Sequence, residues 1–145
     1  MIKVDNWRQL LNAHIEANRF RPFEWYKHDC GAWAGSALEV TTGINPMKGK
    51  LKPYMNGVGA ARSMRRAGFE TPEAMAAGLL GAPKHVVFAR AGDIVAGDLT
   101  ALGIAGEERQ FGLALGVCTG AVSYFVADDG LVELPTLQMK SAFDG

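Results

Sequence analysis

The sequence predicts an α+β fold in which amino-terminal helices pack on a carboxy-terminal antiparallel sheet. Helix signals, with caps, apolar periodicity and glycine or proline stops, fill the chain up to Pro83. Short apolar or alternating runs separated by glycines fill the rest. Because the two kinds of segment are segregated along the chain, we expect one domain over residues 1–145, with helices laid on the sheet.

Composition limits the classes of function. The chain has 145 residues, of which 48% are hydrophobic and 21% charged, so it can bury a proper core. Fifteen basic and fifteen acidic residues cancel, which argues against a nucleic-acid partner. No apolar run approaches the roughly 18 residues of a membrane span, and the amino terminus lacks the apolar core of a signal peptide. We therefore expect a reducing compartment and two free thiols, Cys30 and Cys118.

The first helix is expected to follow a cap at Asp5 or Asn6. Its apolar face recurs at helical spacing and comprises Trp7, Leu10, Leu11, His14 and Ile15. A histidine on such a face is usually a structural residue at the edge of the core, and we read His14 in that way. The helix should end before the segment Arg19–Phe23.

The second helix carries a cysteine in its first turn. Asp29 is a good N-cap, and no breaker occurs between Gly31 and Gly43, which allows about three to four turns. The positive end of the helix dipole favours a thiolate at Cys30, and His28 could add positive charge. Cys30 is therefore the candidate nucleophile. The aromatic residues just before it either wall the core or line a cleft beside Cys30; they are Phe20, Phe23, Trp25 and Tyr26.

Residues 44–69 form a basic stretch that contains no acidic residue. The stretch is either a solvated face or a contact patch for a partner protein or an anionic polymer. A short helix is expected over Ala60–Ala67, and a further one starts at Thr71–Pro72–Glu73 and ends near Leu80. The basic residues are Lys48, Lys50, Lys52, Arg62, Arg65 and Arg66.

After Pro83 the pattern changes from helical to extended. The Asp128–Asp129–Gly130 sequence is a strong hairpin signal, and Gly120 is expected to turn another pair of strands. The expected strands are His85–Ala89, Asp93–Ala96, Gly112–Cys118, Val122–Ala127 and Leu131–Leu134.

The order of these segments resembles the NlpC/P60 branch of papain-like cysteine peptidases. The resemblance rests on Asp29–Cys30–Gly31 at a helix start, then Gly92–Asp93–Ile94–Val95, then the strand Phe111–Gly116. The chain is more closely similar to uncharacterised NlpC/P60-like proteins coded among phage and prophage tail genes. That likeness also covers Thr42–Pro46, Arg62–Gly68, Leu115–Cys118 and Asp129–Pro135, and so nearly the whole chain.

The resemblance implies a nucleophile at Cys30 but no base in the expected place. Where the peptidases carry their histidine, this sequence has Gln110, or Phe111 if the register slips by one. A glutamine cannot accept the thiol proton at neutral pH. The next strand offers only Ser123 and Tyr124 as a third member of a triad.

His28 and His85 are the substitutes that the chain could recruit as a base. His28 lies two residues before Cys30, and His85 begins an expected strand next to Gly92–Asp93. His28 could equally face solvent or cap the loop, and His85 could be an ordinary strand-end histidine. The histidines and cysteines show no paired metal-ligand spacing, and no phosphate-binding loop occurs, so we expect no metal and no cofactor.

Three hypotheses remain open at this point. The first is a structural or assembly component of a phage tail that keeps a peptidase fold without its activity, with other tail proteins as partners and the virion or host cytoplasm as its location. The second is an active cysteine hydrolase that cuts bacterial cell-wall peptides with Cys30 as nucleophile, and its partner would be peptidoglycan. The third is an unrelated small binding or regulatory domain.

Overall fold

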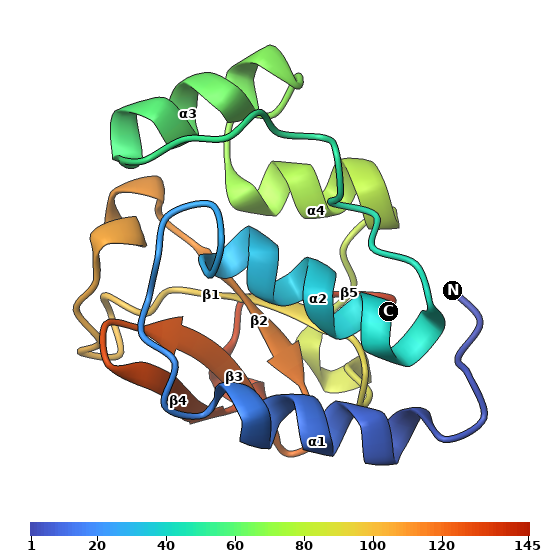
Figure 1. The fold of residues 1–145 in the computed structure, drawn as a ribbon. Helices are drawn as coiled ribbons and strands as arrows, with labels where there is room; N and C mark the ends of the chain where they lie inside the picture. Colours follow the sequence, from blue (N-terminus) through green and yellow to red (C-terminus); the bar gives the residue numbers. More distant parts are fainter.

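The computed structural model describes residues 1–145 as helices packed on one five-stranded sheet, and it confirms the expected α+β class. Four α-helices come first: α1 (Trp7–Asn18), α2 (Cys30–Thr42), α3 (Gly57–Arg66) and α4 (Pro72–Leu80). The strands follow as β1 (Ile94–Gly97), β2 (Ala114–Cys118), β3 (Val122–Ala127), β4 (Gly130–Pro135) and β5 (Ser141–Phe143). Figure 1 shows α2 between α1 on one side and α3 and α4 on the other; α2 contacts β2 and β3, α4 contacts β2 and β5, and α1 packs on α2.

The sheet has the strand order β4-β3-β2-β1-β5, and every neighbouring pair is antiparallel. The β3–β4 hairpin turns at Asp128–Asp129, with Ala127 opposite Gly130, as the sequence predicts. Gly120 has φ 118° between β2 and β3, which is the expected glycine turn. In β2, Gly116 leaves room for the Phe125 ring, because an added Cβ would lie 2.5 Å from that ring.

The core lies between α2 and the sheet. Trp33, Ala34 and Leu38 of α2 are each 0% exposed. The Trp33 indole Nε1 also donates to the carbonyl oxygen of Tyr124 in β3 at 2.9 Å. The helix therefore combines apolar burial with a polar anchor to the middle of the sheet.

One expectation about the sheet is wrong, and one strand of the sheet was not expected. His85–Ala89 is not a strand, because the His85 imidazole Nδ1 accepts from the Val87 amide at 3.1 Å and turns the chain into a 3₁₀ helix, η1 (Val86–Phe88). β5 was not expected, since three residues are too few for a readable alternation. The last two 3₁₀ helices are η2 (Glu107–Phe111), which leads into β2, and η3 (Thr136–Gln138), which leads toward β5.

Candidate functional site

Cys30 is the first residue of α2 and is only 4% exposed. Asp29 caps the helix as expected, since its Oδ1 accepts from the Ala32 amide at 3.0 Å. Its Oδ2 accepts from the Tyr26 amide at 3.0 Å and also from the Tyr54 hydroxyl. Tyr26 has a left-handed backbone with φ 70°, so Asp29 also holds a strained turn in place.

The partner of Cys30 is Glu108, which the sequence did not single out. The Cys30 amide donates to Glu108 Oε1 at 2.9 Å, although the two residues lie 78 positions apart. Glu108 belongs to η2 and is only 6% exposed. A second carboxyl group therefore reaches the amino terminus of α2 from another part of the chain and occupies an amide that an oxyanion would otherwise use.

The electrostatics of the site disfavour a thiolate, contrary to the expectation from the helix dipole. Burial raises the pKa of the Cys30 thiol well above its usual value, and the negative charges of Glu108 and Asp29 raise it further. The Leu115 amide opposes this shift in the pKa only in part. Burial and the Asp29 charge also raise the pKa of Glu108 to about 7. Cys30 is therefore a neutral thiol at neutral pH.

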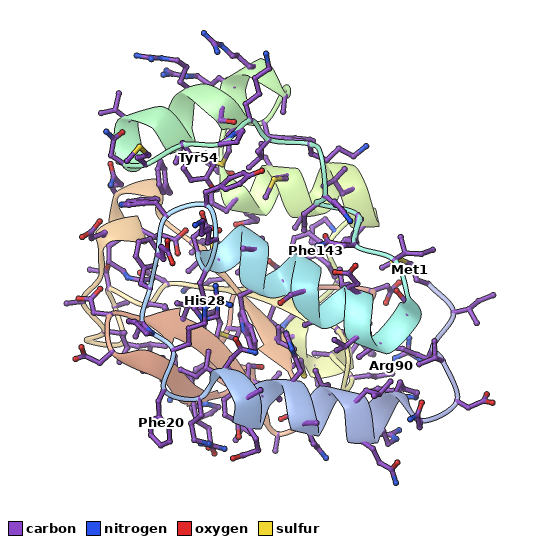
Figure 2. The ribbon with its side chains drawn as sticks, viewed as in Figure 1. Met1, Phe20, His28, Tyr54, Arg90 and Phe143 are labelled. Atoms are coloured by element: carbon purple, nitrogen blue, oxygen red, sulfur yellow. The ribbon has the colours of Figure 1, made fainter.

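His28 does not act as the partner of Cys30. It is 2% exposed, its ring meets Trp33 edge-on at 6.0 Å, and it makes no hydrogen bond to the thiol. Burial lowers the pKa of His28 to about 4, and the positive charge of Arg21 adds to the effect. The imidazole is neutral at pH 7 and supplies no positive charge, which overturns that expectation. Figure 2 shows His28 inside the molecule, below the start of α2.

The other two histidines are structural. His85 is exposed, and its side chain caps η1 rather than facing the thiol. His14 stacks on Trp33 at 5.2 Å between ring centroids and shares a 2.9 Å hydrogen bond with Ser36 Oγ. His14 is thus a residue at the edge of the core, as expected.

Gln110 and Phe111 do not take the place of a base. Gln110 is exposed and donates from Nε2 to the Glu107 carbonyl at 2.8 Å, with its amide lying against Gly57 of α3. Phe111 is half-buried and meets Trp25 edge-on at 6.1 Å. The position next to the thiol is filled by Glu108, two residues earlier than the sequence register placed it.

The cavity beside Cys30 is very small. It has about 20 Å³, room for about one water, and Cys30, Tyr54 and Glu108 are among its lining residues. Phe23, Trp25 and Tyr26 instead line a separate groove of about 510 Å³ that Cys30 does not touch. Phe20 is 83% exposed, so it neither walls the core nor lines a cleft by the cysteine.

The strands beside the site supply no replacement for the missing base. β2 carries no imidazole, carboxylate or carboxamide. Ser123 of β3 is fully buried and bonds Thr136 Oγ1 at 2.8 Å, while the Tyr124 hydroxyl donates to Glu133 at 3.2 Å. Both candidate third members are therefore engaged elsewhere.

Binding chemistry at the site is correspondingly limited. No group of three or more His, Cys, Asp or Glu side chains is placed to hold a metal ion. Cys118 is fully buried and its thiol bonds the Gly120 carbonyl at 3.4 Å, which fits a small core residue. None of the helices combines the length and the apolar character needed to cross a membrane.

Glu108 and Tyr54 are the site residues that sequence reasoning missed. Glu107–Glu108–Arg109 reads as an exposed charge run, and Pro53–Tyr54 reads as loop. Only the position of Glu108 in the sequence could have indicated its role: it lies between Gly106 and Gly112, just before the strand that was expected to carry the base. Burial and the Asp29 charge also raise the pKa of the Tyr54 hydroxyl, so it remains a hydrogen-bond donor to Asp29.

Comparison with known proteins gives a family but no activity. No curated protein and no solved structure matches the chain. A family model described as a domain of unknown function (DUF6950) matches residues 2–144. The chain therefore belongs to the DUF6950 family.

Proposed function

We propose that this protein is a structural component of a phage tail, with a papain-like NlpC/P60 fold that has lost peptidase chemistry. The arrangement favours this reading, because a helix that starts at a cysteine packs against an antiparallel sheet. The order of the chain also fits, since α2 comes first and β1 and β2 follow it. The assignment to a tail rests on the resemblance of the sequence to phage and prophage tail proteins. Its partners would be other tail proteins, and its place the virion.

The observation that carries the loss of activity is the contact between Cys30 and Glu108. A thiol hydrolase needs a base that takes the thiol proton and a free amide that stabilises the oxyanion. Here a buried carboxyl group accepts from the Cys30 amide at 2.9 Å, and its negative charge holds the pKa of the thiol up. The same side chain therefore disfavours the thiolate and occupies the amide that would stabilise the oxyanion.

An active hydrolase of cell-wall peptides is the second candidate, favoured by the pKa of about 7 at Glu108. In that reaction the Glu108 carboxylate would take the thiol proton, the Cys30 sulfur would attack the peptide carbonyl, and the protonated Glu108 would return its proton to the leaving amine. The acyl-thioester would then be hydrolysed by water. Such a route requires Glu108 to release the Cys30 amide first.

Alkylation of Cys30 distinguishes the two candidates. We expect iodoacetamide at neutral pH to label Cys30 more slowly than it labels glutathione, as measured by mass spectrometry of tryptic peptides, because the thiol is buried and protonated. Purified peptidoglycan incubated with the protein should release no peptide above a Cys30→Ser control. Fast labelling at Cys30 alone, or release of peptides that depends on Cys30, would overturn the structural proposal.

The tail assignment has its own test. We expect mass spectrometry of purified virions from a host that carries this gene to detect the chain in particles with assembled tails. Detection in tailed particles but not in isolated heads supports the proposal. Complete tailed particles without the chain contradict it.

A further inference from the structure

We propose that this protein associates with further copies of itself in a head-to-tail manner through two oppositely charged ends. The basic end is the outer face of α3 with the adjoining loop, defined by Lys52, Met55, Val58, Arg62, Arg65 and Arg66. The acidic end is the β3–β4 hairpin with the adjoining loop after α1, defined by Phe20, Asp128, Asp129 and Glu133. The inference concerns surfaces remote from Cys30 and does not depend on the chemistry of the thiol.

The basic end collects charge that nothing in the molecule neutralises. Residues 40–69 contain six basic residues and no acidic one. Arg62, Arg65 and Arg66 follow each other at i, i+3 and i+4 on α3, so they share one face of the helix, and all three are exposed. The ion pairs of the molecule involve Arg19, Lys27, Lys84 and Arg90 instead.

Two exposed apolar side chains extend the basic end along the same helix. Val58 lies one turn before Arg62 and is 68% exposed, and Met55 just before α3 is 91% exposed. The opposite face of α3 is the buried one, since Ala60 and Met64 are 3% and 4% exposed. The outer face of α3 thus offers an aliphatic anchor followed by a row of cations, a combination typical of protein-binding surfaces.

The acidic end has the complementary composition. Outside residues 40–69 the chain carries nine basic and fifteen acidic residues, a net charge of −6. Asp128 and Asp129 form the hairpin turn, are exposed and have no ion pair. With Phe20, which is 83% exposed, they line a hollow of about 490 Å³. Arg19 also borders this hollow, but it forms an ion pair with Glu16, with 2.5 Å between the guanidinium nitrogen and Oε1, which neutralises its charge.

The positions of the two ends imply a head-to-tail assembly of molecules. In Figure 2, Phe20 lies at one end of the molecule, and Tyr54 lies beside α3 at the other. A contact between unlike surfaces on opposite sides of a subunit does not close on itself as a twofold dimer does, and it continues from copy to copy into a filament or a larger ring. In such a contact, Met55 can meet the Phe20 ring, and the arginines can pair with the hairpin aspartates.

A second copy fits these surfaces better than a nucleic acid does. The six positive charges are balanced within the chain, so a long polyanion that extends beyond α3 would meet a surface of net negative charge. Base stacking also needs a free aromatic face, and Trp25 is already met by Phe23, Tyr54 and Phe111. The charge that complements the arginines is present on the same chain.

Analytical ultracentrifugation of the full chain tests this inference. At low ionic strength, we expect the weight-average mass to rise with concentration and to pass the dimer without a plateau, and added salt should reverse the rise. Arg62→Glu/Arg65→Glu/Arg66→Glu and Asp128→Lys/Asp129→Lys should each be monomeric alone. An equimolar mixture of the two variants should associate again, because their charges are swapped but still complementary.

A matched control separates this contact from general attraction between charged proteins. Arg8→Glu/Arg90→Glu/Lys140→Glu carries the same net charge as the α3 variant but leaves both ends intact, so on its own it should still associate, whereas the α3 variant should be monomeric. Circular dichroism should show each variant folded, since every changed side chain is exposed. Loss of association in the control as complete as in the α3 variant, or a wild-type protein that stays monomeric while its arginines bind polyglutamate, would overturn self-association; the second result would indicate a different acidic protein as partner.

Discussion

At the scale of single residues, the carboxyl group of Glu108 decides the chemistry of the site. It accepts from the Cys30 amide, and its charge helps to hold the thiol protonated. A histidine in contact with the sulfur would have the opposite effect, because an imidazolium favours the thiolate. The same position beside a helix terminus can therefore activate a cysteine or silence it, depending on the sign of its charge.

Removing the charge of Glu108 should make Cys30 more reactive. In Glu108→Gln the carboxamide oxygen can still accept from the Cys30 amide, but the negative charge is gone. We expect the pKa of the thiol to fall, and alkylation at a fixed pH below that pKa to become faster by about tenfold. The measurement is the rate of iodoacetamide labelling of Cys30 as a function of pH.

Glu107→Gln is the matched control for this prediction. Glu107 is the exposed neighbour of Glu108 on η2, and its carboxylate accepts from the Trp25 indole at 2.6 Å. Its loss should leave the labelling rate of Cys30 near that of the wild type. Equal acceleration in the two variants would mean that the loop had loosened, and the electrostatic explanation would be wrong.

At this scale, the sequence predicted local contacts and missed distant ones. The Asp29 cap follows from a preference within four residues, and the structure confirms it. The Cys30–Glu108 contact joins residues 78 positions apart, so no local pattern contains it. Gln110 was expected beside Cys30 because the sequence was counted as one continuous strand. Residues 107–111 instead form the short helix η2, in which Glu108 is buried and Gln110 is exposed.

At the scale of elements, α2 is held at its start by two carboxyl groups from different parts of the chain. Asp29 binds the helix to the loops of Tyr26 and Tyr54, and Glu108 binds it to the segment before β2. These contacts fix the position of the helix against the sheet. They also draw two negative charges to the positive end of one helix dipole.

Loss of the Asp29 side chain should destabilise the domain more than loss of an ordinary cap. Asp29→Ala removes the acceptor of the Ala32 amide and leaves the Tyr26 amide and the Tyr54 hydroxyl without partners. We expect the free energy of unfolding to fall by about 2–4 kcal/mol, measured by urea denaturation.

Asn56→Ala supplies the comparison for Asp29→Ala. Asn56 caps α3 by accepting from the Gly59 amide at 2.8 Å, but it lies at the surface. Its loss should cost about 1 kcal/mol of unfolding free energy. If the two substitutions cost the same, then Asp29 is only a helix cap, and its contacts to the two loops add nothing to stability.

Most of the elements could be predicted from the sequence, and the exceptions have physical reasons. Thr71–Pro72–Glu73 starts α4 as expected, and β3 spans the predicted residues 122–127. The apolar run after His85 reads as a strand, but the side chain of that residue bonds the backbone two residues on. β5 depends on pairing with β1 rather than on its own composition.

At the scale of the whole molecule, two buried titratable groups oppose each other in their effect on stability. Burial lowers the pKa of His28 to about 4, so its contribution to stability is present above about pH 6.5 and is lost as the pH falls toward 4. The pKa of Glu108 is raised to about 7, so its contribution is present below about pH 4.5 and is lost as the pH rises toward 7.

The wild-type protein should therefore show a shallow dependence of stability on pH between about 4.5 and 6.5. In Glu108→Gln the effect of His28 remains, together with that of His14, whose pKa burial also lowers, and the free energy of unfolding should fall by at least about 2 kcal/mol as the pH drops from 6.5 to 4.5. Urea denaturation at several pH values measures both curves. Parallel curves for the two proteins would show that Glu108 is not a buried titrating group.

The sheet order has a consequence for how the chain reaches its native state. β1 is fully buried, yet one of its two edges is covered only by β5, whose residues 141–143 come 44 positions or more after it in the chain. Until those residues arrive, an apolar edge in the middle of the future sheet stays open to pairing with other chains. The slow, sequence-distant closure by β5 is thus the step at which a folding molecule is most exposed to aggregation, and a chaperone that shields β1 would act there.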